Sequence, residues 1–310
     1  MRIIFMGNPG FAVPSLQSIS ESSHEIIAVV SNPPKRIGRG NKIIETAVGI
    51  TANAMEIPLL QPPKLNEKHF LQYIWSMRPD IFVVVAYKIL PDKLLSIPKY
   101  GAINLHPSLL PIYRGAAPIQ WSLINGDSQT AVTTISLSGE IDAGQILLQE
   151  TVDIKNDDNY GSLASRLSKI GADLVVKTLN GIEEGNLTEI SQDESKVTLA
   201  PKIKSNDYKI DWTKTAMQVN NLIRAFSPSP GAFTSFNEKR LKIYSSSMLD
   251  NISEKIKCGE IVICSKNQLV IQTGKGLLEI GDVQIEGKRR MGIEEFLRGT
   301  KLQSNMMFGD

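Results

Sequence analysis

The chain has 310 residues, of which 42% are apolar and 21% are charged, and its net charge is +2. This composition suits a globular protein with room for two domains. It excludes a disordered chain, which combines low hydrophobicity with high net charge. The charge is unevenly divided, because residues 1–200 carry a net −3 and residues 201–310 a net +5. The last third is therefore compatible with an anionic partner such as nucleic acid.

The chain starts with a short apolar run, residues 1–6, which Gly7 and Pro9 follow at once. A secretory signal would need a longer apolar region and a small-residue cleavage site. The apolar runs elsewhere are far shorter than the roughly 20 residues of a membrane span. We therefore expect a cytoplasmic protein that does not bind membranes.

Cys258 and Cys264 make up the whole cysteine content. Their spacing fits neither a zinc site nor a disulfide framework. We interpret them as two isolated thiols on successive strands, and we expect no metal.

Residues 2–30 combine an apolar strand (2–6), a helix (about 12–20) and a buried strand (25–30). This order predicts a parallel βαβ unit. A dinucleotide site is rejected, because the motif at Gly7 lacks the full glycine fingerprint and no acidic residue ends the second strand.

Residues 32–42 are rich in Pro, Gly and positive charge, which predicts a loop. Two interpretations stay open. The stretch is either a solvated connection or a flexible basic loop that grips an anionic partner. Its four basic residues are Lys35, Arg36, Arg39 and Lys42.

Residues 43–106 continue the alternation of helices and strands. The pattern predicts helices over 43–55 and 66–77, an extended segment over 57–62, a buried central strand over 81–86, a helix from 90 and a strand into Asn104. In open α/β sheets, ligands bind at the carboxyl ends of the strands, which is where Gly7, Tyr87 and Asn104 fall.

The remaining elements complete two domains. Two extended runs between 131 and 148 flank a loop that carries Asp142, and a helix over about 161–180 with a turn at 181–185 follows. The last third begins with a helix over about 213–226, and its short runs between Gly or Asn turns predict a small antiparallel barrel. We expect a first domain at 1–185, a linker at 186–206 and a second domain at 207–310.

Asn104 and His106 lie two residues apart, so on a strand their side chains leave the same face. Asp142 would add a carboxylate at that strand end. The three groups suit acyl transfer to an amine, because an amide can stabilise an oxyanion, an imidazole can move a proton and a carboxylate can orient the imidazole. On spacing alone, a structural pair and a turn aspartate remain the alternatives, with Arg114 as a surface charge and Tyr87 as a half-buried aromatic.

The motif at residues 104–119 reads Asn-Leu-His-Pro-Ser-Leu-Leu-Pro and, two residues later, Arg-Gly-Ala-Ala-Pro-Ile. It resembles the signature of the 10-formyltetrahydrofolate-dependent formyltransferases. Other stretches are similar to the family members that act on methionyl-tRNA, and the resemblance runs from about residue 2 to 300. These stretches are Phe5-Met-Gly-Asn-Pro-Gly-Phe-Ala12, Gly38-Arg39-Gly40, Ala200-Pro-Lys-Ile, and the motifs at 210–212 and 223–232.

The resemblance implies an α/β fold with a Rossmann-like, mostly parallel sheet in the N-terminal domain and a C-terminal OB-type β-barrel domain. It implies formyl transfer from 10-formyltetrahydrofolate to the α-amine of methionyl-initiator tRNA, with Asn104, His106 and Asp142 as catalytic residues. We expect a monomer. By the same resemblance, folate contacts fall on Ala86, Tyr87, Ser108, Leu109, Leu110 and Pro111, and tRNA or substrate contacts on Phe11, Lys35, Arg36, Arg39, Lys42 and Arg114.

The sequence departs from the family near the expected folate site. Leu-Ser-Gly-Glu at 137–140 stands where the family has Met-Asp-x-Gly, residues 88–91 lack a glycine and one further residue, and Gly10 replaces a common acid. Two other classes of function stay open, a formyltransferase of sugar amines and an inactive protein that binds tRNA or folate.

Overall fold

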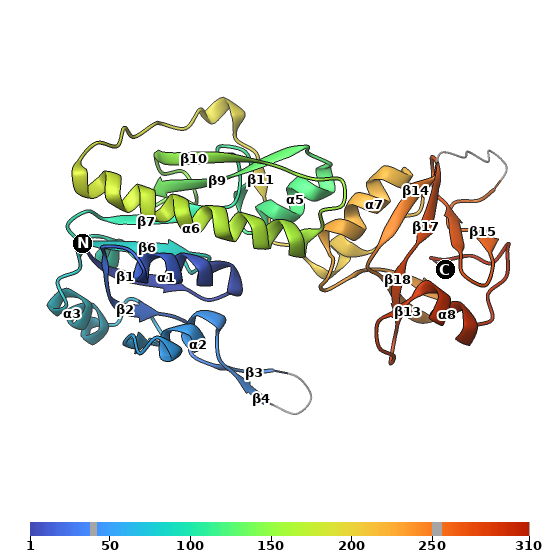
Figure 1. Ribbon diagram of the computed structural model, residues 1–310, viewed down its shortest axis with the longest axis horizontal. Helices are drawn as coiled ribbons and strands as arrows, with labels where there is room; N and C mark the ends of the chain where they lie inside the picture. The colour runs from blue at the N-terminus through green and yellow to red at the C-terminus, as the bar shows by residue number, and fades with distance from the viewer. Residues whose placement is uncertain (38–41, 250–255, 310) are drawn as a thin grey trace. The chain divides into compact units, whose positions relative to one another are not determined.

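The computed structural model describes residues 1–37, 42–249 and 256–309 (Figure 1). By its internal contacts the chain divides into two compact units. The predicted boundaries at 185 and 207 stay a prediction, while the contacts assign two segments that precede residue 185 to the second unit. The first unit comprises Met1–Pro118, Gln129–Asp153 and Ala164–Ala200, and the second Ile119–Ser128, Ile154–Leu163 and Pro201–Asp310.

A seven-stranded sheet forms the first unit, in the order β10-β9-β7-β6-β1-β2-β5. All neighbouring strands from β7 to β5 are parallel, and β9 is antiparallel to both β7 and β10. The predicted mostly parallel, Rossmann-like sheet is therefore confirmed, with the Val-rich strand β6 at its centre. The strands are β1 (Arg2–Gly7), β2 (Glu25–Val30), β5 (Leu59–Leu60), β6 (Ile81–Val85), β7 (Ala102–His106), β9 (Gln129–Ser136) and β10 (Ile146–Asp153).

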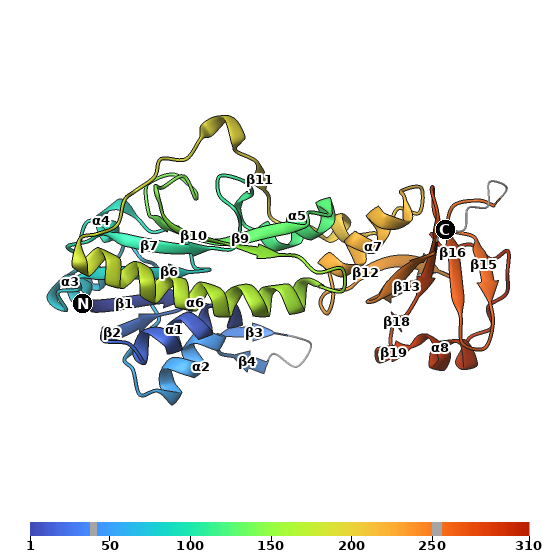
Figure 2. The same ribbon diagram turned by 45° about the horizontal axis from the view of Figure 1, so that its top comes forward.

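Helices cover both faces of this sheet (Figure 2). On one face, Phe70 of α3 and Leu94 of α4 share a buried apolar cluster with Ala102 of β7. On the other face, α6 lies so close to β7 that a Cβ on Gly171 would meet Leu105 Cδ2 at 2.6 Å. The helices of this unit are η1 (Gly10–Ala12), α1 (Val13–Ser20), α2 (Ala47–Ala54), α3 (Lys68–Ser76), α4 (Asp92–Leu95), η2 (Glu194–Lys196) and, from Ala164 on, α6 (Tyr160–Glu184).

Helix α6 is longer than the sequence predicted. The turn expected at 181–185 is wrong at its start, because Gly181 lies inside the helix. Gly185 follows the last helical residue with a φ of +67°, a left-handed conformation that a glycine adopts without strain. One glycine therefore ends the helix and the other does not.

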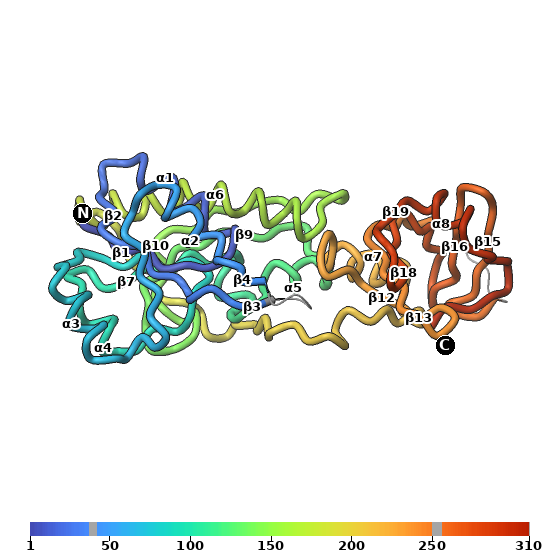
Figure 3. Tube along the Cα trace, turned by 90° about the horizontal axis from the view of Figure 1, so that it is seen from below, coloured from blue at the N-terminus to red at the C-terminus, as the bar shows by residue number. Residues whose placement is uncertain are grey.

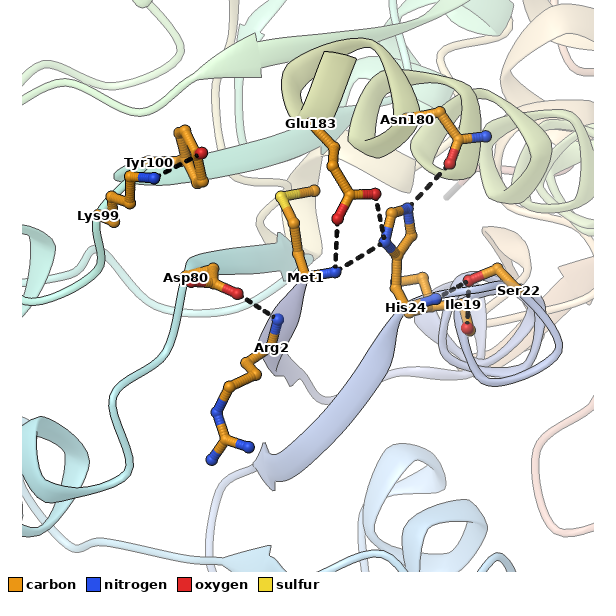
Figure 4. A network of polar contacts seen from close by, with 10 residues as sticks. All are labelled: Met1, Arg2, Ile19, Ser22, His24, Asp80, Lys99, Tyr100, Asn180 and Glu183. Atoms are coloured by element: carbon orange, nitrogen blue, oxygen red, sulfur yellow. Dashed lines mark hydrogen bonds and ion pairs between the residues drawn. The ribbon is translucent and has the colours of Figure 1, made fainter. Parts of the chain in front are cut away.

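Polar contacts join the last turns of α6 to the starts of β1 and β2 (Figure 4). His24 Nε2 lies 3.0 Å from Asn180 Oδ1, and the Met1 amine lies 3.0 Å from Glu183 Oε1. Burial is the main cause that lowers the pKa of His24, and the neighbouring amine adds to it. A neutral His24 thus accepts or donates hydrogen bonds within this cluster.

The loop predicted over 32–42 is partly wrong, because β3 (Lys35–Ile37) and β4 (Lys42–Ile44) pair as an antiparallel hairpin. The helix predicted from 43 begins only at Ala47. Its N-cap is Thr46, whose hydroxyl accepts the backbone N–H of Gly49 at 2.9 Å and so satisfies one of the free donors at the helix start. Arg39 lies outside the described residues.

Two antiparallel sheets of four strands each form most of the second unit. The antiparallel arrangement predicted for the last third is confirmed, and its closure into an OB-type barrel stays a prediction. One sheet has the order β12-β13-β18-β19 and the other β14-β17-β16-β15. The strands are β12 (Ala232–Phe236), β13 (Lys239–Ile243), β14 (Ser246–Leu249), β15 (Ile261–Cys264), β16 (Leu269–Gln272), β17 (Leu277–Ile280), β18 (Asp282–Ile285) and β19 (Met291–Gly292).

The helices that accompany these sheets are α5 (Pro118–Asn125), η3 (Ser205–Tyr208), α7 (Ala216–Ala225) and α8 (Ile293–Gly299). Helix α7 packs against β14 and β17. Helix α8 packs against β18 and β19, and Figure 3 shows it beside β19. Helix α7 begins three residues later than predicted, after a capping box in which Thr215 and Gln218 exchange hydrogen bonds.

The helices of the described residues include none that is both long and apolar enough to cross a bilayer. Both cysteines are free thiols, of which Cys264 lies in β15 and Cys258 in the turn before it, so only one of them is on a strand as expected.

Candidate active site

Strand β7 places Asn104 and His106 on one face of the sheet. Ala102, Asn104 and His106 occupy every second position of the strand, so their side chains leave the same face. Helices α3 and α4 cover this face near the start of the strand, at Ala102. His106 is buried, and Asn104 is half-buried. Both side chains extend from a strand whose backbone is paired with β6 on one side and with β9 on the other.

The third residue, Asp142, reaches them from the loop between β9 and β10. Its Oδ1 lies 3.5 Å from Asn104 Nδ2, and its Oδ2 lies 3.5 Å from His106 Nδ1. Asp142 has a φ of +51°, and Gly144 passes so close to β9 that a Cβ there would lie 1.6 Å from Ser136 O. The loop can therefore take this path only with a glycine at 144.

The ring of His106 is oriented from both sides. Its Nε2 lies 2.9 Å from the backbone oxygen of Tyr113. Because a carbonyl oxygen only accepts hydrogen bonds, Nε2 carries a proton in this geometry. Nδ1, which faces Asp142, is then the ring nitrogen that is free to exchange a proton within the site.

The carboxylate of Asp142 is itself held. Its Oδ2 accepts the backbone N–H of Gly115 at 2.9 Å. Gln192, which no motif in the sequence singled out, donates its amide to the backbone oxygens of Asp142 and Gly144, each at 2.7 Å. The signal was hidden because Gln192 lies in a polar stretch without periodicity.

Arg114 is buried, so the interpretation as a surface charge is wrong. Its Nε donates to Gln192 Oε1 at 2.9 Å, and its two terminal nitrogens donate to Glu194 at 2.7 and 3.2 Å. The predicted contact between Arg114 and the substrate stays a prediction. In this structure its guanidinium is bonded to Gln192 and Glu194.

The predicted folate segment leaves β7 in a tight turn. The hydroxyl of the buried Ser108 donates to Ile112 O at 2.6 Å, and Gln149 donates to Leu110 O at 3.2 Å. Leu110 is buried, whereas Leu109 and Pro111 are half-buried. The faces of Leu109 and Pro111 are therefore the parts of this segment that a ligand can touch.

The end of β6 lies beside this region, because Val85 pairs with Leu105. Ala86 is exposed with a φ of +49°. The hydroxyl of Tyr87 is buried, and among the described residues it has no hydrogen-bond partner. Burial raises the pKa of Tyr87 to about 12, so the phenol is neutral at physiological pH and available to a polar ligand.

The other predicted contact residues lie at the first strands. Phe11 is half-buried in η1, just beyond the carboxyl end of β1. Lys35, Arg36 and Lys42 are exposed on the hairpin of β3 and β4. No described contact links these four residues to Asn104, His106 or Asp142. Among residues 1–37, 42–249 and 256–309, no three His, Cys, Asp or Glu side chains gather as a metal site would require.

The chain matches two family models along most of its length. The formyl transferase model matches residues 1–179, and the model of the formyl transferase C-terminal domain matches residues 202–301. Among similar solved structures is WlaRD, a sugar 3N-formyl transferase crystallised with dTDP and 5-N-formyl-THF. It has a TM-score of 0.67 at 21% identity, over 93% of this chain and 99% of its own.

A further structure, an N-formyltransferase from Helicobacter canadensis with folinic acid and dTDP-3-aminofucose, has a TM-score of 0.68 at 20% identity, over 90% of this chain and 97% of its own. At such identities both structures support the fold alone.

The sequence relatives are much more similar to this chain. The methionyl-tRNA formyltransferase of Lachnospira eligens is 41% identical over 100% of both chains, and that of Geobacter metallireducens is 40% identical over 100% of this chain and 99% of its own. Identity of this extent along the whole chain, and not in one motif alone, places the chain in the formyl transferase family, among the methionyl-tRNA formyltransferases.

Proposed function

We propose that this chain transfers a formyl group from 10-formyltetrahydrofolate to the α-amine of methionyl-initiator tRNA, giving N-formylmethionyl-tRNA for translation initiation. One observation carries the proposal: Asn104, His106 and Asp142 meet on one face of β7 in a chain that is 41% identical, end to end, to a methionyl-tRNA formyltransferase.

The reaction joins the amine nitrogen to the formyl carbon and breaks the bond between that carbon and N10 of the folate. The formyl oxygen becomes an oxyanion in the tetrahedral intermediate, and the Asn104 amide is the donor aimed at it. Preorganised donors of this kind contribute about 3 kcal/mol to transition-state stabilisation in known enzymes. Asn104 therefore acts on the oxygen and leaves the proton to other groups.

One proton must leave the attacking nitrogen, and one must reach the departing N10. We assign this exchange to Nδ1 of His106, because Nε2 is engaged by the Tyr113 carbonyl. Asp142 orients the ring and stabilises it when it is protonated. The amine is itself the nucleophile, so no side chain has to form a covalent intermediate.

The folate side of the site fits the strand ends next to β7. The buried hydroxyl of Tyr87, which has no partner among the described residues, and the exposed Ala86 offer polar contacts, and Leu109 and Pro111 offer apolar ones. Ser108 and Leu110 shape this segment through the hydrogen bonds of its turn. When bound, the folate supplies the formyl group, and these residues orient it toward Asn104.

The proposed contacts with tRNA depend on positive charge. Lys35, Arg36 and Lys42 are exposed on the hairpin, and Arg39 lies between its strands in the sequence. We propose that they contact the acceptor stem, with Phe11 near the methionyl end. Residues 201–310 carry a net +5 and would follow the phosphate backbone, an attraction that weakens steeply with salt.

The organisation of the whole protein also remains a proposal. We assign formyl transfer to residues 1–185 and tRNA binding to 207–310, joined by 186–206, in a cytoplasmic monomer. Light scattering behind size exclusion measures the mass, and fractionation of cells measures the compartment.

The test is an assay with 10-formyltetrahydrofolate and charged initiator tRNA. We expect formylmethionyl-tRNA to accumulate with turnover. Formylation of a nucleotide-linked amino sugar but not of methionyl-tRNA would overturn the proposal. Tight tRNA binding without turnover would make the chain a binding protein instead.

A further inference from the structure

We propose that Gln192, fixed by Arg114 and Glu194, is a positioning residue that sets where the carboxylate of Asp142 lies. This inference rests on the proposed function, because it takes Asp142 to be a working part of the formyl-transfer site. Gln192 lies in residues 186–206, which the sequence presents as a linker. The inference gives this linker a direct part in building the site.

The amide of Gln192 makes three hydrogen bonds to two different parts of the unit. Its nitrogen donates to the backbone oxygens of Asp142 and Gly144, and its oxygen accepts Arg114 Nε. An amide NH₂ has two protons, and both are used. The side chain is therefore oriented at both ends and cannot rotate without losing all three bonds.

Arg114 is in turn fixed by Glu194. Its guanidinium is buried, and it pairs with both carboxylate oxygens of Glu194 in the forked geometry that arginine favours. Strand β8 (Arg114–Gly115) also pairs in parallel with β11 (Leu199–Ala200). Before Gln192, Ile190 forms a bridge with Ile146, so the segment is attached on both sides of that residue.

The loop of Asp142 needs such support. Residues 138–141 are exposed, and Asp142 itself has a left-handed backbone conformation that an aspartate adopts less readily than a glycine. The described hydrogen bonds that reach Asp142 from distant parts of the chain come from Gly115, Asn104 and Gln192. The bonds from Gly115 and Asn104 reach the carboxylate of Asp142, whereas the bonds from Gln192 hold the backbone of the loop.

The test compares Gln192→Glu with the natural chain. This change keeps the length and an oxygen that can accept Arg114 Nε, but it replaces the two donors by an anion next to two carbonyl oxygens. We expect kcat to fall by about 10-fold to 100-fold, since small displacements of reacting groups have effects of this size. KM values for tRNA and folate should stay within about 3-fold, because Arg114 keeps its acceptor in this variant and the other predicted contact residues do not bond to Gln192.

A second readout does not depend on activity. The Gly115 N–H donates to Asp142 Oδ2, whereas its neighbours Arg114 and Ala116 donate their N–H groups to Thr198 O and Ala200 O of the adjoining segment. In Gln192→Glu we expect faster hydrogen exchange at Gly115 with little change at Ala116. Gln192→Leu, which removes the donors without adding charge, should show the same pattern.

Gln129→Glu is the matched control, because Gln129 is exposed on β9 and its amide donates to Asp153 at 2.8 Å. It should leave kcat and Gly115 exchange unchanged. Unaltered Gly115 exchange in both Gln192 variants, or equal acceleration at Gly115 and Ala116, would overturn the inference. If the natural chain shows no formyl transfer, the proposed function fails while the exchange experiment still decides the positioning role.

Discussion

Asn104 and His106 are held in a different way from Asp142, although the three side chains meet. The first two extend from β7, whose backbone is paired on both sides within the sheet. Asp142 lies in a loop whose position depends on Gly115 and on the amide of Gln192.

The difference has consequences for how each residue responds to change. A paired central strand moves little when one side chain is replaced, because many backbone hydrogen bonds and a packed core hold it. A loop held by a few side-chain bonds moves when any one of them is lost. Substitutions far from the chemistry should therefore act through Asp142 and not through Asn104 or His106.

The largest expected effect is that of His106→Ala on the strand side. It removes the proton route and should lower kcat by about 10²-fold to 10⁴-fold in the formyl-transfer assay, with the fold intact by circular dichroism. His69→Ala is the control, because His69 is exposed on α3 and pairs only with Glu67 among the described residues. Near-full turnover of His106→Ala would refute the assignment of proton transfer.

Asn104→Ala should lower kcat by about 10²-fold, since it removes one donor to the oxyanion, with a small change in KM. The control is Asn186→Ala, which changes an exposed asparagine just after α6. A raised KM at unchanged kcat would mean that Asn104 binds the substrate and does not stabilise the transition state. With either outcome β7 should keep its place, because its backbone is paired on both sides.

Tyr87→Phe tests the neighbouring strand end, that of β6. If the hydroxyl contacts the folate, KM for the formyl donor should rise about 10-fold, the equivalent of one hydrogen bond of about 1.4 kcal/mol. The free protein should become slightly more stable, because a buried hydroxyl that lacks a described partner is removed. Tyr73→Phe, an exposed tyrosine on α3, is the control. Unchanged KM together with unchanged stability would count against the folate contact.

Glu194→Gln should have the smallest effect, on the loop side. Its hydrogen bond to Arg114 is the main cause that lowers the pKa of Glu194 from 4.5. A lowered pKa in the folded state means that the pairing stabilises the protein above pH 4.5, and that this contribution is lost as the pH falls through the lowered value. The melting temperature of Glu194→Gln should lie slightly below that of the natural chain at pH 7.

The difference in melting temperature should shrink when both proteins are measured at acid pH. Glu189→Gln offers a comparison, because Glu189 is exposed and no described ion pair involves it. A difference for Glu194→Gln that stays constant with pH would show that the charge of Glu194 is not what holds Arg114.

Local patterns predicted the strand side of the site well. The Val-rich run at β6 and the alternation through Asn104 and His106 correctly indicated a central strand and a shared face. The failures came where local signals competed. A charged, Pro- and Gly-rich stretch favoured a loop where β3 and β4 pair, and Gly181 suggested a turn where the packing of α6 keeps it helical.

The sequence by itself determined the family, the mostly parallel sheet and the shared face of Asn104 and His106, because strand alternation and motif identity are properties of neighbouring residues. Only the tertiary structure decided how Asp142 is held. The residues that hold it are distant in sequence: Arg114 meets Gln192 and Glu194 across 78 and 80 positions, and Gln192 meets Asp142 across 50. No local periodicity reports hydrogen bonds over such separations, since they form only when the sheet has brought the segments together.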